Sequence, residues 1–335
     1  MGTRGWQELD ESDVRVRPGR GSRPRSKRRP QHADAEEAMV VAVDRGRWTC
    51  ALHGDPGHLV VAMRAKELGR TPVVVGDRVR LVGDTSGKPD TLARIVGGAE
   101  RESVLRRTAD DTDPYERVVV ANAGQLVIVS ALADPAPRTG LIDRCLVAAY
   151  AGGLSPVLCL TKSDLADPTE LTAAYRALDL TVLVSGIDTD PAELRELLDG
   201  RVSALVGHSG VGKSTLVNKL VPEAERATAV VSGVGKGRHT STSVVAHALP
   251  GLERSWVVDT PGIRSFGLAH VTADDVIAAF EGLDEAAEEC PPNCGHLGGS
   301  DDPDCHLDAF AEENGEQERL RALRRLLHSR AGRDV

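Results

Sequence analysis

The segment LVGHSGVGKSTLVNKLV, residues 205–221, decides the fold because it contains the pattern G-x-x-x-x-G-K-S of a phosphate-binding loop. Its glycines remove side chains where the backbone must wrap around a phosphate, so that amide N–H groups can point inward. The apolar residues before the pattern predict a buried strand, and those after it predict a helix whose positive end faces the phosphates. The expected phosphate-loop contacts are Gly207, His208, Ser209, Gly210, Val211, Gly212, Lys213, Ser214 and Thr215.

A second motif, WVVDTPG, completes the phosphate side of the predicted site and places Asp259 45 residues after Ser214. Lys213 is expected to reach the β and γ phosphates, where it also serves catalysis, and the Ser214 hydroxyl is expected to bind Mg²⁺. The apolar run before the second motif predicts a buried strand that brings Asp259 close to the metal. Gly262 is expected to turn its N–H toward the γ-phosphate.

The stretch VLCLTKSDL, residues 157–165, is the best candidate for reading the base of the nucleotide. The Asp164 carboxylate can accept both N1–H and N2–H₂ of guanine, a pattern that adenine does not offer. Lys162 can lay its stem over the ring, and the backbone N–H groups of Ser185 and Gly186 can face the guanine O6. A site that uses ATP, as in a kinase or a transporter-like ATPase, is the alternative. The expected base contacts are Thr161, Lys162, Ser163, Asp164 and Ser185.

The order of these motifs is unusual, because the base motif precedes the phosphate loop. A parallel sheet depends on which strands are neighbours and not on which comes first, so joining the old ends and cutting elsewhere leaves the pocket intact. From about residue 117, Val- and Leu-rich runs alternate with predicted helices, which indicates a parallel sheet covered on both faces. Residues 99–270 are therefore predicted to form a circularly permuted P-loop GTPase domain with a mostly parallel sheet.

The group that orients the attacking water is not supplied by the usual residue. Many small GTPases have a Gln after the DTPG-type turn, whereas this chain has Ile263, which cannot form a side-chain hydrogen bond. The polar, Gly-rich segment 232–243 contains Thr240 and Thr242, either of which can close on Mg²⁺, and Thr240 is taken as the catalytic candidate. His239 is the favoured water-positioning group, because an imidazole donates or accepts near neutral pH. The alternative is that His239 packs or touches RNA.

The segments before the GTPase domain have a different character. Residues 36–98 show five short alternating runs separated by Gly, Asp and Pro, which predict a small barrel of the OB-fold type. Trp48 is the one aromatic residue there, so contact with structured RNA is favoured over base stacking. A barrel that only braces its neighbour is the alternative.

The N-terminal arm, residues 1–35, is rich in Arg, Gly, Pro and Ser and is predicted to be disordered alone. Residues 1–32 carry nine Lys or Arg and four Asp or Glu, a net charge of +5, so the total of −9 leaves −14 for the rest. This asymmetry favours a polyanionic partner over a solvated tail without a role.

No apolar run approaches the ~20 residues of a membrane span, and the charged N-terminus lacks the apolar segment of a secretion signal. We therefore expect a soluble cytoplasmic monomer that does not contact membranes.

The C-terminal region, residues 271–335, is predicted to be helical around a cysteine cluster in the segment CPPNCGHLGGSDDPDC. Three thiolates and one imidazole satisfy a tetrahedral structural Zn²⁺, and His306 is a possible substitute ligand. Cysteines without a metal are the alternative. The last helix, ERLRALRRLLHSR, is expected to pack through its leucines and to present a possible basic outer face. The expected zinc ligands are Cys290, Cys294, His296 and Cys305, whereas Cys50, Cys145 and Cys159 are expected in cores.

The motif set as a whole resembles a known family, the circularly permuted ribosome small-subunit-dependent GTPases, which are assembly factors of the bacterial 30S subunit. The resemblance runs from about residue 38 to 330 and rests on LIDRCL, TKSD, GHSGVGKST, GRHTST, DTPGIRSFG and the cysteine cluster. It implies an OB-fold, a permuted GTPase domain and a helical zinc domain. The chain departs from the family pattern in TKSD for NKxD, in Gly186 for Ala, and in the C-x3-C-x-H-x8-C spacing for the more frequent C-x4-C-x-H-x5-C.

This resemblance implies a function as well as a fold. The chain is expected to bind the 30S subunit and its 16S rRNA and to hydrolyse GTP to GDP during late maturation, stimulated by the subunit. Its expected cofactors are GTP or GDP, Mg²⁺ and one structural Zn²⁺. The alternative is an RNA-binding module in which the nucleotide only stabilises a switch and turnover is negligible.

Overall fold

The structure is a computed structural model that describes residues 32–69, 71–108, 115–176, 178–222, 224, 243–260 and 267–332. Residues 1–31, which make up most of the predicted basic arm, lie outside this part of the chain. None of the helices in the described ranges has the length and apolar character needed to cross a membrane.

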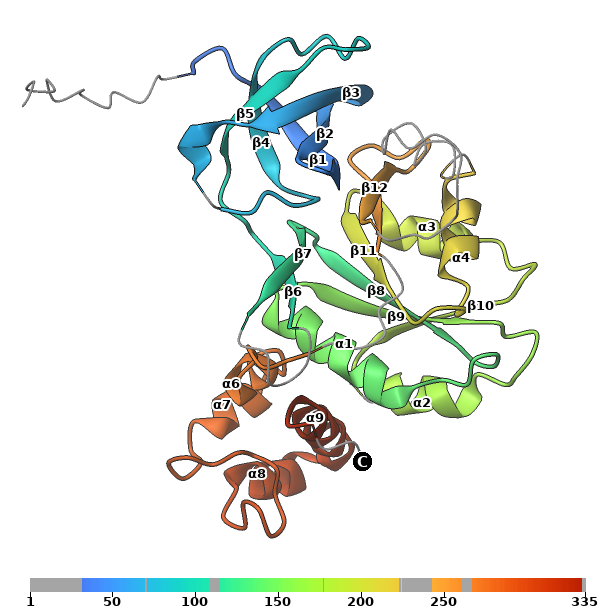
Figure 1. Ribbon diagram of the computed structural model, residues 1–335. Helices are drawn as coiled ribbons and strands as arrows, with labels where there is room; N and C mark the ends of the chain where they lie inside the picture. The colour runs from blue at the N-terminus through green and yellow to red at the C-terminus, as the bar shows by residue number, and fades with distance from the viewer. Residues whose placement is uncertain are drawn as a thin grey trace, which may run out of the picture. The chain divides into compact units, whose positions relative to one another are not determined.

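The first five strands close into a small barrel, which confirms the predicted OB-like fold (Figure 1). β1 pairs with β2 and β4, β2 pairs with β3, and β5 joins β3 to β4, so the barrel has no free edge. Alternate residues point inward, and Val40, Val60 and Ile95 are fully buried in the barrel core. A 3-10 turn, Lys66–Leu68, follows β3. The strands are β1 Glu36–Asp44, β2 Arg47–Leu52, β3 Asp55–Arg64, β4 Arg78–Gly83 and β5 Ala93–Gly98.

A two-stranded antiparallel sheet, formed by β6 (Val104–Arg107) and β7 (Arg117–Ala121), precedes the main sheet. The main sheet then has the order β10-β9-β8-β11-β13-β12, with every neighbouring pair parallel except β12 and β13. β12 also touches β1 of the barrel at one register position. The strands are β8 Gln125–Ala131, β9 Ser155–Thr161, β10 Thr181–Ser185, β11 Val202–Val206, β12 Val245–Ala248 and β13 Trp256–Asp259.

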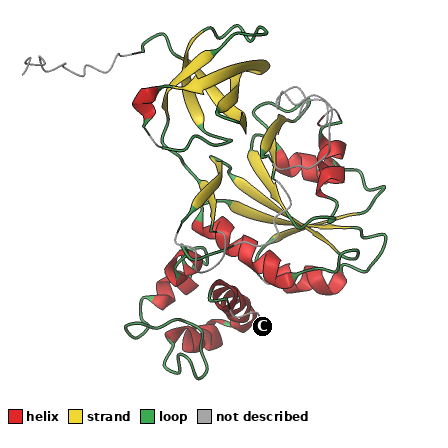
Figure 2. Ribbon diagram, viewed as in Figure 1, coloured by secondary structure: helices red, strands yellow, loops and turns green. Residues whose placement is uncertain are grey.

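Helices cover both faces of the main sheet, as its near-continuous apolar strands predict (Figure 2). Along β8, Leu126 and Ile128 join the core that contains α1, whereas Val127 and Val129 join the core that contains α3 and α4. This alternation is the two-residue period of a strand buried on both sides. The covering helices are α1 Thr139–Ala151, α2 Thr169–Arg176, α3 Ala192–Leu198 and α4 Lys213–Leu220.

The C-terminal segment is helical, as the sequence predicts, and its last helix packs against α1 (Figure 1). Leu320, Leu323 and Leu327 are all buried on one face of this last helix. Its predicted basic outer face is largely wrong, because Arg319, Arg324, Arg325 and Arg330 bind acceptors within the protein and Arg321 is exposed. The helices are α6 Ala273–Ile277, α7 Leu283–Ala287, α8 His306–Asn314 and α9 Gln317–Arg330.

The contact between α1 and α9 explains the LIDRCL motif. Arg325 Nε donates to the buried Asp143 carboxylate at 3.0 Å, and its guanidinium lies 4.8 Å from the centre of the Tyr175 ring. The next residue, Arg144, donates to the Ser329 carbonyl at 2.9 Å. Two adjacent residues of α1 therefore anchor the C-terminal helix through charge-assisted hydrogen bonds.

We predict that Asp143→Ala destabilises the protein. Removing the carboxylate leaves Arg325 without its anion, and the expected loss in free energy of unfolding is about 2–3 kcal/mol, below the ~3–5 kcal/mol of a fully buried pair. The smaller value is expected because the Arg325 side chain is 31% exposed. Urea unfolding measures the change.

Glu102→Ala is the matched control for this variant, since it removes the carboxylate of an exposed pair with Arg78. Surface pairs contribute about 0–1 kcal/mol, so the control is expected to unfold close to the wild-type midpoint. Equal midpoints for the two variants would contradict the role given to Asp143.

Candidate nucleotide site and metal centre

The predicted nucleotide contacts come from strands that end at one edge of the main sheet. β11 leads into the phosphate loop, β13 ends at Asp259, β9 ends at Thr161 and β10 ends at Ser185. These four strands run parallel, so their carboxyl ends meet where open α/β sheets bind ligands. The fold therefore brings together segments that are far apart in the sequence.

The phosphate loop depends on two glycines for different reasons. A Cβ atom at Gly207 would lie 2.5 Å from the Val129 carbonyl oxygen, so only a residue without a side chain lets the loop pass this close to β8. Gly212 precedes the first residue of α4 with φ of +91°, a conformation that L side chains rarely adopt. The loop consequently enters α4 with its amide groups near the helix N-terminus, where phosphates are favoured.

Lys213 joins the two phosphate-side motifs. Its side chain is 8% exposed, and its ammonium group lies 2.5 Å from Asp259 Oδ1 and also donates to the Thr260 carbonyl. The Thr260 hydroxyl in turn donates to the Leu205 carbonyl of β11 at 2.6 Å. Ser214 is exposed beside this pair. The phosphate loop and β13 are thus tied together through a buried lysine.

Thr161 joins the base motif to the phosphate loop. Its buried hydroxyl lies 2.5 Å from the Val211 carbonyl and 3.3 Å from the Ser130 carbonyl. Because a hydroxyl has one hydrogen, the nearer Val211 carbonyl is the main acceptor. This contact gives a physical role to the threonine that replaces the usual asparagine of NKxD.

The Asp164 carboxylate is held next to a second loop at the end of β10. Its Oδ1 accepts from the Ile187 N–H at 3.2 Å, and the Ser163 N–H donates to the Ser185 carbonyl at 3.3 Å. Asp164 is itself exposed, so its remaining acceptor positions face outward. Lys162 has a positive φ of 59° and donates from Nζ to the Asp134 carbonyl.

Gly186 differs from the sequence expectation in one respect. Its N–H donates to Thr189 Oγ1 at 2.7 Å and does not point freely toward a base, which leaves Ser185 as the candidate donor to guanine O6. A Cβ atom at Gly186 would lie 3.0 Å from Ser163 Oγ and 3.3 Å from Asp164 Oδ1. The tight approach to both residues accounts for glycine where the family pattern has alanine.

Four predicted residues lie outside the described residues: the catalytic candidates His239 and Thr240, the alternative Thr242, and Gly262.

Sequence reasoning also missed contacts at this edge, namely the Thr260 carbonyl, Thr189 and Lys219. Lys219 donates to two carbonyls located 33 and 30 residues earlier in the chain. No local pattern in the sequence signals such contacts, because both partners are backbone atoms of a distant loop.

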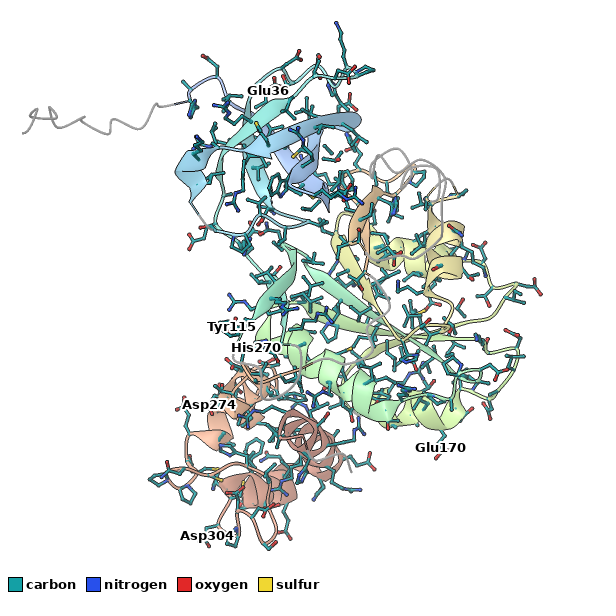
Figure 3. The ribbon with its side chains drawn as sticks, viewed as in Figure 1. Glu36, Tyr115, Glu170, His270, Asp274 and Asp304 are labelled. Carbon is teal, nitrogen blue, oxygen red and sulfur yellow. The ribbon has the colours of Figure 1, made fainter. Side chains whose placement is uncertain are left out.

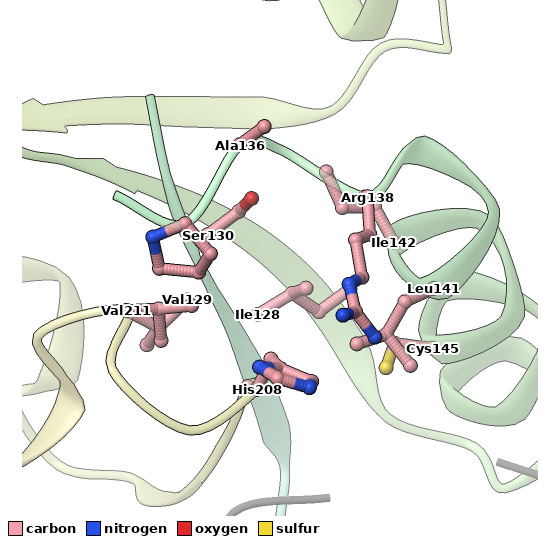
Figure 4. Close-up of a pocket in the computed structure, with 12 residues that line it drawn as sticks. Ile128, Val129, Ser130, Ala136, Arg138, Leu141, Ile142, Cys145, His208 and Val211 are labelled. Atoms are coloured by element: carbon pink, nitrogen blue, oxygen red, sulfur yellow. The ribbon is translucent and has the colours of Figure 1, made fainter. Parts of the chain in front are cut away.

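A separate cavity lies between the phosphate loop and α1 (Figure 4). Its lining includes His208 from the loop, Arg138 before α1, and Cys145 on α1. Burial raises the pKa of the Cys145 thiol to about 12, so this sulfur stays protonated. Burial has the same effect on the pKa of Cys50 and Cys159, which fits their predicted place in the cores.

The four predicted zinc ligands converge on one point. The ligand atoms of Cys290, Cys294, His296 and Cys305 all lie within 4.8 Å of one another, and the sulfurs of Cys290 and Cys305 are 4.0 Å apart. Tetrahedral Zn–S bonds of about 2.3 Å imply a sulfur separation of about 3.8 Å. His296 Nδ1 is buried without a hydrogen-bond partner in the protein, as expected for a nitrogen that binds a metal. The donor set therefore fits zinc.

Two charged residues hold the ligand loop in this shape. The Asp302 carboxylate accepts from the Gly295 and Leu297 N–H groups, each at 2.9 Å, and the Gly295 bond in particular lowers the pKa of Asp302. Arg324 of α9 donates to the His296 carbonyl at 3.2 Å. Asp304, which belongs to the same loop, is labelled in Figure 3.

His306, the alternative ligand, takes part in a different contact. Its Nε2 lies 3.3 Å from a Glu289 carboxylate oxygen, and it is not among the residues that converge on the metal position. The geometry thus favours His296 over His306 as the nitrogen ligand.

The strand order and the position of the motifs define the class of this protein as a circularly permuted P-loop GTPase. The strands that end at the base-reading segments, β9 and β10, precede the phosphate-loop strand β11 in the chain, and in the sheet β8 lies between them and β11. The model of the RsgA GTPase family matches residues 98–269. The chain belongs to the RsgA GTPase family, and it is an enzyme that hydrolyses GTP.

Individual relatives agree with this assignment. A Chlorobaculum parvum protein named small ribosomal subunit biogenesis GTPase RsgA is 39% identical over 255 residues, covering 73% of this chain and 80% of that protein. The crystal structure of YjeQ from Thermotoga maritima is 25% identical, with a TM-score of 0.62 and coverage of 89% of this chain and 99% of that one. YloQ, described as a circularly permuted GTPase, shares the fold at 20% identity and a TM-score of 0.63, covering 92% and 99% of the two chains.

We predict that Cys294→Ser loses the metal and loosens the chain from about residue 285 onward. A lost ligand should weaken zinc binding by more than the ~10–100-fold that a lost supporting residue costs. Metal analysis and hydrogen exchange measure the two effects, and GDP binding is expected to survive because the nucleotide site lies on another part of the fold.

His306→Ala is the control, since it removes the neighbouring imidazole and should leave the zinc content unchanged. Loss of zinc from His306→Ala together with its retention in His296→Ala would show that the nitrogen ligand is wrongly assigned.

Proposed function

We propose that this chain binds the small (30S) ribosomal subunit and its 16S rRNA, and hydrolyses GTP during late maturation of that subunit. In this proposal the subunit stimulates hydrolysis, and the protein acts as a cytoplasmic monomer. Its working parts are the basic arm (1–35), the OB-fold (36–98), the GTPase domain (99–270) and the zinc-binding helical domain (271–335). The names of the curated relatives, which refer to biogenesis of the small ribosomal subunit, support the role in maturation.

The observation that carries the nucleotide part of the proposal is the hydrogen bond between Thr161 and Val211. It joins the base motif to the phosphate loop, so guanine and phosphates can be held at a fixed separation. In the proposal Asp164 reads the base, Lys213 contacts the β and γ phosphates, and Ser214 binds Mg²⁺ near Asp259. When bound, the metal would neutralise charge that develops on the phosphates.

Contact with rRNA is supported by the charge of the arm and by the contacts that the Trp48 side chain makes within the barrel. The Trp48 indole N–H donates to the Val73 carbonyl at 2.9 Å, and Arg64 lies 5.9 Å from the ring centre. This indole is engaged within the barrel, so recognition through RNA shape and phosphates is favoured over base stacking. The Lys- and Arg-rich arm would add sequence-independent affinity.

We predict that Asp164→Asn weakens GDP binding by about 10–100-fold, because a hydrogen bond to a charged group contributes about 1.5–3 kcal/mol and about 1.4 kcal/mol is a factor of ten. The asparagine amide can donate to the C2 oxygen of xanthine, so affinity for XDP should rise in the same variant. Equilibrium titration with both nucleotides measures the change, and an unchanged GDP affinity would remove Asp164 from base recognition.

A further prediction concerns the rate of GTP hydrolysis in the presence of the small subunit. We expect small subunits to raise phosphate release, and His239→Ala to lower the stimulated rate by about 10²-fold or more while GTP and subunit binding persist. The reason is that Ile263 cannot orient water and an imidazole can. Single-turnover hydrolysis with and without subunits provides the measurement.

Two other outcomes would separate the alternatives. A wild-type rate that subunits leave unchanged would favour an RNA-binding module whose nucleotide only stabilises a switch. A stimulated rate that His239→Ala retains would assign water positioning to a group of the subunit.

A further inference from the structure

Lys219 lies on α4, the helix that begins at the end of the phosphate loop, yet its ammonium group binds the loop that approaches the base. Lys219 Nζ donates to the Gly186 carbonyl at 3.1 Å and to the Thr189 carbonyl at 2.9 Å. The side chain is half-buried between the two elements. A charged donor shared by two backbone carbonyls is a stronger restraint than a neutral hydrogen bond.

One of these carbonyls belongs to the peptide group that contacts Asp164. The Gly186 C=O and the Ile187 N–H are part of the same planar peptide, in which the two groups point in opposite directions. Lys219 binds the oxygen side of this peptide, and Asp164 Oδ1 accepts from its nitrogen side at 3.2 Å. The ammonium group is therefore one of the contacts that fix the direction of that N–H.

The same turn is closed by two further bonds. The Thr189 N–H donates to the Gly186 carbonyl at 3.3 Å, and the Gly186 N–H donates to Thr189 Oγ1 at 2.7 Å. These bonds make residues 186–189 a compact unit, and Lys219 attaches that unit to α4. Movement of the unit would carry the Ile187 N–H away from the Asp164 carboxylate.

We propose that Lys219 is a positioning residue for guanine selectivity, acting through the Gly186–Ile187 peptide on the Asp164 carboxylate. The inference rests on the proposed role of Asp164 in reading guanine. Hydrogen bonds that lie in series polarise one another, so the ammonium also strengthens the Ile187 N–H as a donor to the carboxylate. Because Lys219 sits on the phosphate-loop helix, it sets the base contacts relative to the phosphate contacts.

The test is Lys219→Met in the full chain, which keeps the length and the helix propensity of the side chain while removing the charge and the donors. Affinities for GDP and ADP are measured by displacement of a fluorescent GDP analogue. We expect GDP affinity to fall about tenfold, on the order of one hydrogen bond to a charged group, and ADP affinity to change less than about twofold.

Arg195→Met is the matched control. Arg195 of α3 donates to the Leu220 carbonyl at 3.2 Å and the Pro250 carbonyl at 2.7 Å, so it braces the end of α4 without touching residues 186–189. Its loss should lower the unfolding temperature and leave the GDP-to-ADP preference at the wild-type value.

A double variant shows whether Lys219 acts through Asp164. In the Asp164→Asn background, Lys219→Met should produce little further change in the GDP-to-ADP preference, because coupled residues give non-additive effects. An equal loss of GDP and ADP affinity, or full additivity in the double variant, would overturn the inference. A wild-type chain that does not prefer GDP over ADP would instead overturn the proposed reading of guanine.

Discussion

The nucleotide site depends on the parallel pairing of β11 with β8 on one side and β13 on the other. β8 comes before the phosphate loop in the chain and β13 comes after it, so this pairing is what makes the order of the motifs irrelevant to the site. All of these strands end at the same edge, where the backbone of parallel strands leaves room for a ligand. Thr161 and Lys213 then connect the separate loops through buried hydrogen bonds to the Val211 and Thr260 carbonyls.

The permutation leaves the composition of the site intact and alters the segment to which the site is joined. After β13 the chain continues into the C-terminal helices, and α9 returns to α1, whose Asp143 and Arg144 hold it. α1 also supplies Cys145 to the cavity beside the phosphate loop. One side of α1 therefore contacts the surroundings of the phosphate loop, and another side contacts the C-terminal helices. Packed side chains and hydrogen bonds of this kind are one means by which two regions of a protein can be coupled.

The ligand loop of the C-terminal region shows what a bound metal would contribute to the folding of so small a unit. Its polar backbone is held by Asp302 and Arg324, while His296 Nδ1 is buried with no protein partner. A bound zinc ion would satisfy that nitrogen and bring three thiolates together, which contributes folding free energy that a short loop cannot obtain from apolar burial. The two charged residues orient the loop, and the ligands close it.

The sequence by itself determined the class of fold, because the evidence for it is local. The phosphate loop, the five alternating runs of the barrel, the Val- and Leu-rich strands and the cysteine spacing each reflect a short-range requirement of backbone geometry or ligand chemistry. Two short strands, β6 and β12, escaped this reasoning. Each has only four residues, too few for periodicity to distinguish a strand from a loop, and neither leads into a recognised motif. β13 is equally short, but the DTPG motif that begins at its last residue identified it.

Only the tertiary structure decided which polar groups meet. The sequence predicts a basic face for the arginines of α9, but most of them bind acceptors within the protein, because α1, α6 and α8 pack against the helix. The Gly186 N–H turned to Thr189, and Lys219 reached a loop 33 residues earlier. A hydrogen bond between groups distant in the chain depends on where the packed elements place them, and that placement leaves no periodic trace in the sequence.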